Sequence, residues 1–135
     1  MPGSFLDTNV VLYLASGDVR KAERAEQLVR AGGSISVQVL NEAASVSRLK
    51  LRMSWTETRL FLAGLRALLD VREASVETHE TGIMLAERYK LAIYDSMIAA
   101  AALLSECDTL WSEDMHHGLL IDGRVRILNP FVTAA

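Results

Sequence analysis

Two aspartates interrupt apolar stretches of this chain. Asp7 follows the run "SFL", and Asp95 lies near the start of "AIYDSMIAAAALLSE", which has almost no polar face. A helix that is apolar on all sides is normally buried, and an ionised carboxylate in a protein interior costs several kcal/mol unless a cation or donor meets it. No Lys or Arg lies within helical reach on the same face. Both carboxylates therefore need a partner from elsewhere.

Two further acids complete a possible site. Glu42 lies in the first turns of an expected helix, and Asp114 follows an expected strand. Taken singly, either could be an ordinary acid that complements a helix dipole or faces solvent. Four carboxylates brought together would repel one another, whereas a divalent cation would convert that repulsion into binding. Oxygen ligands favour Mg²⁺ or Mn²⁺ over zinc, so the set predicts a site for one of these ions.

The hydrophobic pattern predicts the elements that must position these acids. Short apolar runs indicate strands at "SFLD", "SISV", "VREAS", "DTLWSED" and "RVRILNP". Helical spacing indicates helices at "VVLYLAS", Asp18 to Ala31, "QVLNEAASVSRLKL", Ser54 to Leu69, "VETHETGIMLAERYKL" and the stretch around Asp95. This alternation predicts an α/β three-layer sandwich with a mostly parallel sheet covered by helices. Ligands of such sheets bind at the carboxyl ends of the strands, where all four acids are expected.

Composition limits the class of protein. The 135 residues suit a single domain over 1–135, and half of them are hydrophobic. No apolar run approaches the roughly 20 residues that a membrane span needs, and "MPGSFLDTN" does not resemble a secretory signal, so we expect a cytoplasmic protein. The net charge of −3, from 14 basic and 17 acidic residues, argues against tight nonspecific binding of nucleic acid. The single cysteine, Cys107, is expected to be a small buried hydrophobic residue.

Four short motifs together resemble a known family. "FLDTN", "VLNE", "YDSMIAAAA" and "LWSEDM" resemble, in order and spacing, the motifs of PIN domains, and most closely those of the small ribonuclease toxins of VapBC toxin-antitoxin pairs. The resemblance runs from Phe5 to about Pro130. It implies a PIN-like fold and a catalytic, metal-binding quartet, supported by the hydroxyl of Thr8 or Ser112; the quartet is Asp7, Glu42, Asp95 and Asp114.

The resemblance also implies an activity and partners. Family members hydrolyse RNA phosphodiester bonds, often in tRNA or rRNA, with Mg²⁺ or Mn²⁺ activating a water, and this chemistry needs no protein nucleophile. The expected products carry 5'-phosphate and 3'-hydroxyl ends. A cognate antitoxin should inhibit the enzyme, and we expect a homodimer that can join a larger complex with the antitoxin. Six basic residues either contact the RNA backbone or simply form a solvated helix surface. They are Arg20, Lys21, Arg24, Arg48, Lys50 and Arg52.

Two other functions compete with this interpretation. A metal-dependent phosphatase of a doubly wound fold would use an aspartate nucleophile, but "FLDTNV" lacks the second aspartate of the usual D-x-D loop. A catalytically silent PIN-like module could instead recognise RNA or protein without cutting, although the presence of all four acids argues against it. A zinc site at His116 and His117 is disfavoured because adjacent histidines do not share one helical face.

Overall fold

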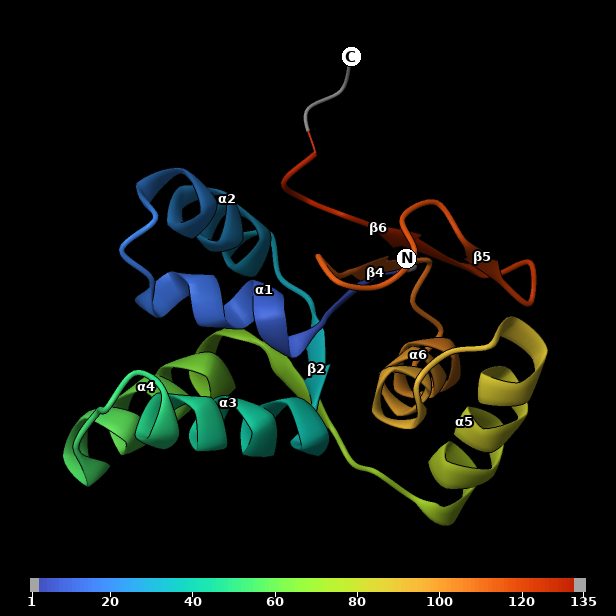
Figure 1. The fold of residues 1–135 in the computed structure, drawn as a ribbon, viewed down its shortest axis with the longest axis horizontal. Coiled ribbons are helices and arrows are strands. Elements are labelled where there is room, and N and C mark those ends of the chain that lie inside the picture. Colours follow the sequence, from blue (N-terminus) through green and yellow to red (C-terminus); the bar gives the residue numbers. More distant parts are fainter. Residues whose placement is uncertain (1–2, 133–135) are drawn as a thin grey trace.

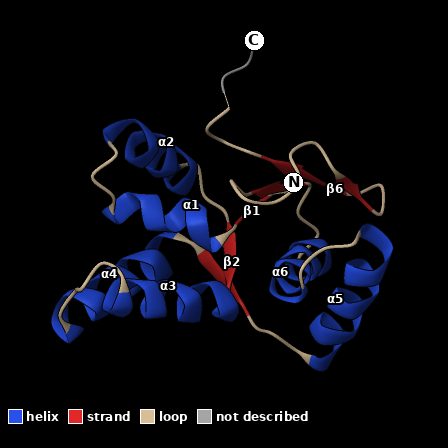
Figure 2. Cartoon of the chain, viewed as in Figure 1, coloured by secondary structure: helices blue, strands red, loops and turns tan. Residues whose placement is uncertain are grey.

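Six short strands form one sheet in the order β3-β2-β1-β4-β6-β5 in the computed structural model, which describes residues 3–132. Figures 1 and 2 show strands of this sheet between the flanking helices. All neighbouring strands are parallel except β5, which runs antiparallel to β6. The strands are β1 (Ser4–Leu6), β2 (Ser34–Ser36), β3 (Asp70–Arg72), β4 (Thr109–Trp111), β5 (Leu120–Ile121) and β6 (Val125–Leu128). The predicted mostly parallel α/β sheet is therefore confirmed.

Helices connect the parallel strands and cover the sheet on both sides (Figure 1). The connections from β1 to β2 and from β2 to β3 carry the first four helices, and the return from β3 to β4 carries the last two. Because parallel crossovers are right-handed, this reversal of direction places the two groups on opposite faces. The helices are α1 (Thr8–Leu12), extended by the 3-10 turn η1 (Tyr13–Ala15), α2 (Val19–Arg30), α3 (Val37–Leu49), α4 (Trp55–Leu68), α5 (Val76–Tyr89) and α6 (Ile93–Leu104).

The helix ends follow the capping signals in the sequence. Asp18 caps α2 by accepting a hydrogen bond from the amide of Lys21, and Gly32 follows that helix with a φ of 84°. Ser54 and Glu57 form the predicted capping box at the start of α4. Such caps satisfy backbone amides that have no partner inside the helix, and they fix where each helix begins.

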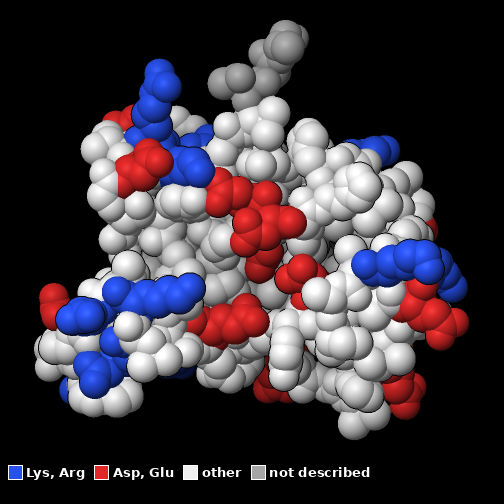
Figure 3. Space-filling model, in the orientation of Figure 1, with Lys and Arg blue, Asp and Glu red and all other residues white. Residues whose placement is uncertain are grey.

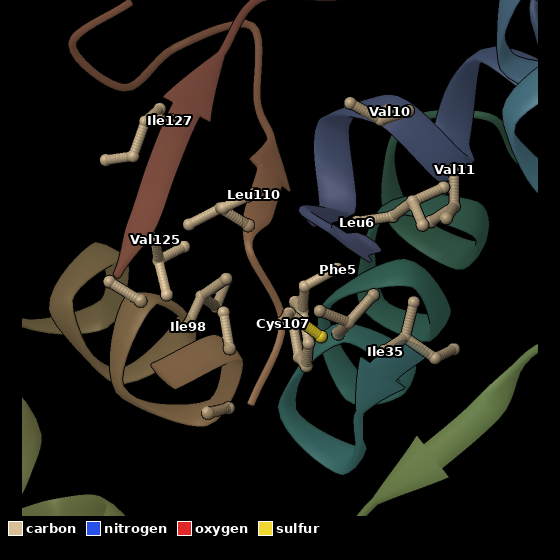
Figure 4. Close-up of a cluster of buried hydrophobic side chains, with 14 of the residues drawn as sticks. Phe5, Leu6, Val10, Val11, Ile35, Ile98, Cys107, Leu110, Val125 and Ile127 are labelled. Atoms are coloured by element: carbon tan, nitrogen blue, oxygen red, sulfur yellow. The ribbon is translucent and has the colours of Figure 1, made fainter. Parts of the chain in front are cut away.

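The core lies on both faces of the sheet and accounts for the apolar character of α6. Phe5, Ile35, Leu110 and Ile127 from four strands are completely buried, and they meet side chains from the flanking helices (Figure 4). The alanine run of α6 is 0 to 4% exposed, because α6 packs between the sheet and α5. As expected, Cys107 is buried in this core.

Gly82 explains how α5 approaches α6 so closely. A Cβ atom at this position would lie 2.5 Å from the sulfur of Met97 in α6. Glycine costs about 1 kcal/mol in a helix interior, but here its lack of a side chain lets the two helices pack together. The predicted helix therefore tolerates Gly82 for a packing reason.

The short strand β5 was not predicted. Ile121 pairs with Val125 across a tight loop in which Asp122 and Gly123 both have positive φ angles. Asp-Gly is a known hairpin signal, but a strand of two residues is too short to show alternation. Among residues 3–132, no helix combines the length and apolarity needed to cross a membrane.

Candidate active site

Four segments bring acidic side chains to the carboxyl edge of the sheet. Asp7 directly follows β1, and Asp114 lies in the loop after β4. Helix α3 starts immediately after β2 and carries Glu42, while the first turn of α6 carries Asp95. Because β1, β2 and β4 are parallel, their carboxyl ends meet at the same edge. Figure 3 shows acidic side chains gathered near the centre of the face that exposes this edge.

Asp7 is the most enclosed member of the set, with 4% of its surface exposed. Its Oδ1 accepts a hydrogen bond from the amide of Thr8 at 2.7 Å, and its Oδ2 accepts one from Oγ of Ser112 at 2.7 Å. Burial raises the pKa of Asp7 to about 6, the two hydrogen bonds oppose the shift, and the charges of Asp95 and Glu42 add to it. Ser112 is thus a supporting hydroxyl for Asp7.

Glu42 is held by one hydroxyl and one amide. Oγ1 of Thr8 donates to Oε1 of Glu42 at 2.5 Å, and Nε2 of Gln38 donates to its Oε2 at 3.2 Å. Nε2 of Gln38 also donates to the backbone carbonyl of Tyr94 at 3.0 Å. Both hydroxyls expected near the acids therefore contact one of them, Thr8 on Glu42 and Ser112 on Asp7.

Asp95 contacts neither a cation nor a hydrogen-bond donor in the described part of the chain. Partial burial raises its pKa, and the nearby charges of Asp114 and Glu42 raise it further. The ion pairs formed by residues 3–132 include none of the four acids. The charged groups near Asp95 are therefore other carboxylates, and no cation among residues 3–132 forms an ion pair with it.

The donor chemistry of this cluster fits a hard divalent cation, although its present arrangement does not enclose one. Carboxylate oxygens without a competing lysine or arginine are the ligands that Mg²⁺ and Mn²⁺ prefer. Within residues 3–132, however, no three His, Cys, Asp or Glu side chains converge closely enough to hold a metal ion. Neighbouring hydroxyl and amide groups donate hydrogen bonds to Glu42 and Asp114 in this arrangement.

Two neutral residues of the site were missed by the sequence analysis. Nδ2 of Asn9 donates to Oδ2 of Asp7 at 3.2 Å and to Oδ2 of Asp114 at 3.1 Å. Gln38 joins Glu42 to the first turn of α6, as described above. A signal existed for Gln38, because it precedes Glu42 by four residues and shares its helical face. For Asn9 the only signal was its place two residues after Asp7 in "DTN".

Glu113 is close to the cluster but has its own partners. Nζ of Lys21 contacts its Oε2 at 2.5 Å, and the hydroxyl of Tyr13 donates to its Oε1 at 2.5 Å. Burial raises the pKa of Glu113, but these two hydrogen bonds outweigh burial and leave it below the usual value. Lys21, one of the basic residues expected near RNA, is therefore paired with Glu113 in this structure.

Two other members of that basic set also make internal contacts. Nε of Arg24 donates to the carbonyl of Pro130 at 3.0 Å. The guanidinium of Arg48 lies 4.1 Å from the ring centroid of Trp55, a cation-π contact. These contacts fix side chains on α2 and α3 and reduce their freedom to follow a bound polyanion.

Comparison with known proteins places this arrangement in a family. The family model of the PIN domain matches residues 4–117. No curated protein matches the chain. Among solved structures, a toxin-antitoxin complex from Klebsiella pneumoniae is similar with a TM-score of 0.73 and 21% identity, and the match covers 95% of this chain and 98% of that chain.

Two other solved structures have the same fold. The toxin VapC20 from Mycobacterium tuberculosis, described as cleaving the sarcin-ricin loop, has a TM-score of 0.65 and 18% identity over 82% of this chain and 89% of that chain. DNA-bound VapBC from Salmonella typhimurium has a TM-score of 0.69 and 18% identity over 96% and 99% of the two chains. The family match covers most of the sequence, and the folds agree. The chain therefore belongs to the PIN-domain family.

Proposed function

We propose that this protein is a metal-dependent endoribonuclease and the toxin of a toxin-antitoxin pair. The observation that carries the proposal is the uncompensated acidic cluster at the carboxyl edge of the sheet. Four segments contribute carboxylates there, and the described residues supply no ion pair to any of them. A cluster of this kind is unfavourable unless a cation completes it, and functional sites are where such unfavourable arrangements occur.

In this proposal the four carboxylates hold Mg²⁺ or Mn²⁺. A divalent cation, when bound, neutralises charge on phosphate oxygens and activates water for attack. Ser112 and the amide of Thr8 orient Asp7, while the hydroxyl of Thr8 orients Glu42. Burial and neighbouring carboxylates raise the pKa values of Asp7 and Asp95, and a bound cation would offset this repulsion. The substrate is RNA, with tRNA or rRNA as the expected targets.

The partner in this proposal is a small antitoxin protein. Similar structures from Klebsiella pneumoniae and Salmonella typhimurium are described as a toxin-antitoxin complex and as DNA-bound VapBC. Here, a groove of about 330 Å³ starts at Asn9 in the acidic cluster and is lined mainly by apolar atoms, including those of Leu12, Tyr13, Val46 and Leu51. An apolar antitoxin segment in this groove would end beside the carboxylates, where a basic side chain could pair with them. We also propose that two copies of this chain form a homodimer.

Cleavage of RNA by the purified protein tests the proposal. Protein freed of any antitoxin should cut single-stranded RNA with Mg²⁺ or Mn²⁺, and excess EDTA should stop the reaction. Asp95→Asn should abolish cleavage and remain folded. Glu80→Gln, which removes one exposed carboxylate on α5, is the matched control and should cut like wild type. Cleavage that persists in EDTA, or in Asp95→Asn, would contradict the proposal.

One observation favours a second candidate, a catalytically silent module that binds RNA or protein. The carboxylates do not enclose a metal site in their present arrangement. Calorimetric titration of the metal-free protein with Mg²⁺ and Mn²⁺ separates the two candidates. If the protein is an enzyme of the proposed kind, wild type should bind the ion and Asp95→Asn should not. A silent module should show no saturable binding at this cluster.

A further inference from the structure

Tyr94 is an exposed aromatic residue directly beside the acidic cluster. It lies in the first turn of α6, and 72% of its surface is exposed although the following turns of that helix are buried. The next residue is Asp95. Its neighbour Ile93 is also 49% exposed. An exposed tyrosine contributes little to the core, so its position at the rim of the cluster calls for another explanation.

The backbone that carries Tyr94 is held in place by two side chains. Nε2 of Gln38 donates to the carbonyl of Tyr94 at 3.0 Å, and Oγ of the buried Ser96 donates to the carbonyl of Ile93 at 2.7 Å. The same Gln38 nitrogen contacts Glu42 at 3.2 Å. The ring is therefore exposed on a fixed support, and its position is tied to two of the acids. Tyrosine also has only two side-chain torsions to restrict on binding.

The helix geometry places the ring to the side of the cluster. Successive Cα atoms are about 3.8 Å apart, and successive side chains on a helix do not point in the same direction. The side chains of Tyr94 and Asp95 thus leave the first turn of α6 in different directions. A phosphodiester held at the carboxylates would carry a nucleotide on each side, and Tyr94 is the exposed aromatic residue next to Asp95.

We infer that Tyr94 stacks on an unpaired base next to the scissile phosphate, and so sets a preference for single-stranded RNA. This inference rests on the proposed nuclease function. Base-aromatic stacking is a sequence-tolerant interaction worth about 1–3 kcal/mol per base when the aromatic residue is replaced by alanine. Bases inside an A-form duplex are already stacked on one another, so the substrate position opposite Tyr94 has to be a loop, a bulge or an end.

Steady-state kinetics with a single-stranded oligonucleotide test this inference. Tyr94→Leu keeps an apolar side chain but removes the ring, and it should raise KM roughly 5- to 100-fold with kcat nearly unchanged, since stacking is lost equally before and during the reaction. Tyr94→Phe keeps the ring and should behave like wild type. Leu60→Ala is the control, because this apolar side chain is 69% exposed on α4, and it should leave KM unchanged.

A second substrate shows whether the ring contacts a base. Oligonucleotides that lack one base, on either side of the cleaved bond, should be poor substrates for wild type at one of the two positions only. At that position Tyr94→Leu should cut the intact and base-less oligonucleotides equally well. Thermal melts should be unchanged in all Tyr94 variants, because the side chain is exposed.

The outcomes separate this inference from the proposed function. If wild type cuts RNA but Tyr94→Leu cuts it with an unchanged KM, the stacking role is wrong and the nuclease function stands. An unchanged KM together with weaker inhibition by the antitoxin would instead assign Tyr94 to a protein interface. If wild type fails to cut any RNA, the proposed function itself is wrong.

Discussion

Asn9 and Asp114 lie 105 positions apart in the chain and are joined by a hydrogen bond of 3.1 Å from Nδ2 to Oδ2. The same nitrogen also donates to Asp7, and Oδ1 of Asn9 accepts a hydrogen bond from the amide of Glu113. A neutral amide thus links two carboxylates and fixes the loop after β4 against the start of α1. Each polar atom of the Asn9 side chain has a partner in the site.

Asn9→Asp should destabilise the metal-free protein. The substitution is nearly isosteric, but it replaces a donor that lies 3.2 Å from Asp7 and 3.1 Å from Asp114 with another negative charge. We expect a loss of about 1–3 kcal/mol in the free energy of unfolding, measured by urea denaturation in EDTA. Mg²⁺ should recover part of it. The exposed Asn41→Asp on α3 is the control, and an equal loss in both variants would contradict a specific role for Asn9.

Asp7 should make stability depend on pH. Its folded-state pKa of about 6 lies above the value of 3.8 expected for the unfolded chain, so folding favours the protonated carboxyl. Below about pH 3.8 Asp7 is protonated in both states and does not lower the free energy of unfolding. As the pH rises its ionisation lowers that free energy, by about 3 kcal/mol above pH 6. Without metal, the free energy of unfolding of Asp7→Asn relative to that of wild type should increase by about 2 kcal/mol between pH 4 and pH 7. A difference independent of pH would show that Asp7 has an ordinary pKa.

Asp95→Asn should relieve repulsion and remove the response to metal. The pKa of Asp95 is raised by burial and by the charges of Asp114 and Glu42. We therefore expect the metal-free variant to melt at the temperature of wild type or above it. Mg²⁺ at 100 times its dissociation constant should stabilise wild type by about 2.7 kcal/mol and the variant by much less. A lower melting temperature without metal, with an unchanged response to Mg²⁺, would make Asp95 a structural helix-capping residue only.

The buried hydroxyl of Thr58 should be replaceable without loss of stability. Thr58 is 1% exposed, and its Oγ1 has no hydrogen-bond partner among the described residues. Thr58→Val keeps the shape and removes an unsatisfied polar group, so the free energy of unfolding should stay the same or rise by about 1 kcal/mol. The same substitution at Thr78, whose Oγ1 accepts from the amide of Ser75, should cost about 1 kcal/mol. Equal losses at both positions would contradict this.

Much of the fold follows from local patterns in the sequence. The capping box at Ser54, the cap at Asp18 and the buried runs around Phe5 and Leu110 each mark the start of a helix or the body of a strand. The strand β5 could not be predicted, because its two residues depend on pairing with β6 and not on their own periodicity.

The candidate site was only partly predictable. The four acids could be grouped because parallel strands bring their carboxyl ends together. The amide partner of Asp114 could not, since the contact from Asn9 joins distant segments whose side-chain directions only the fold decides. The same is true of the ion pair between Lys21 and the neighbouring Glu113. The ion pair of Lys21 is the clearest example, because the sequence alone does not show that this cation has a partner.

Mapping of RNA ends in cells tests the central claim, that the acidic cluster cuts RNA, most directly. After brief induction of wild type or Asp7→Asn in the natural host, the 5' ends of all cellular RNAs are sequenced by a method that requires a 5'-phosphate. We expect new ends at a small number of single-stranded sites in tRNA or rRNA with wild type, and none of them with Asp7→Asn at equal protein levels. The same new ends with both proteins, or new ends with neither, would contradict the claim.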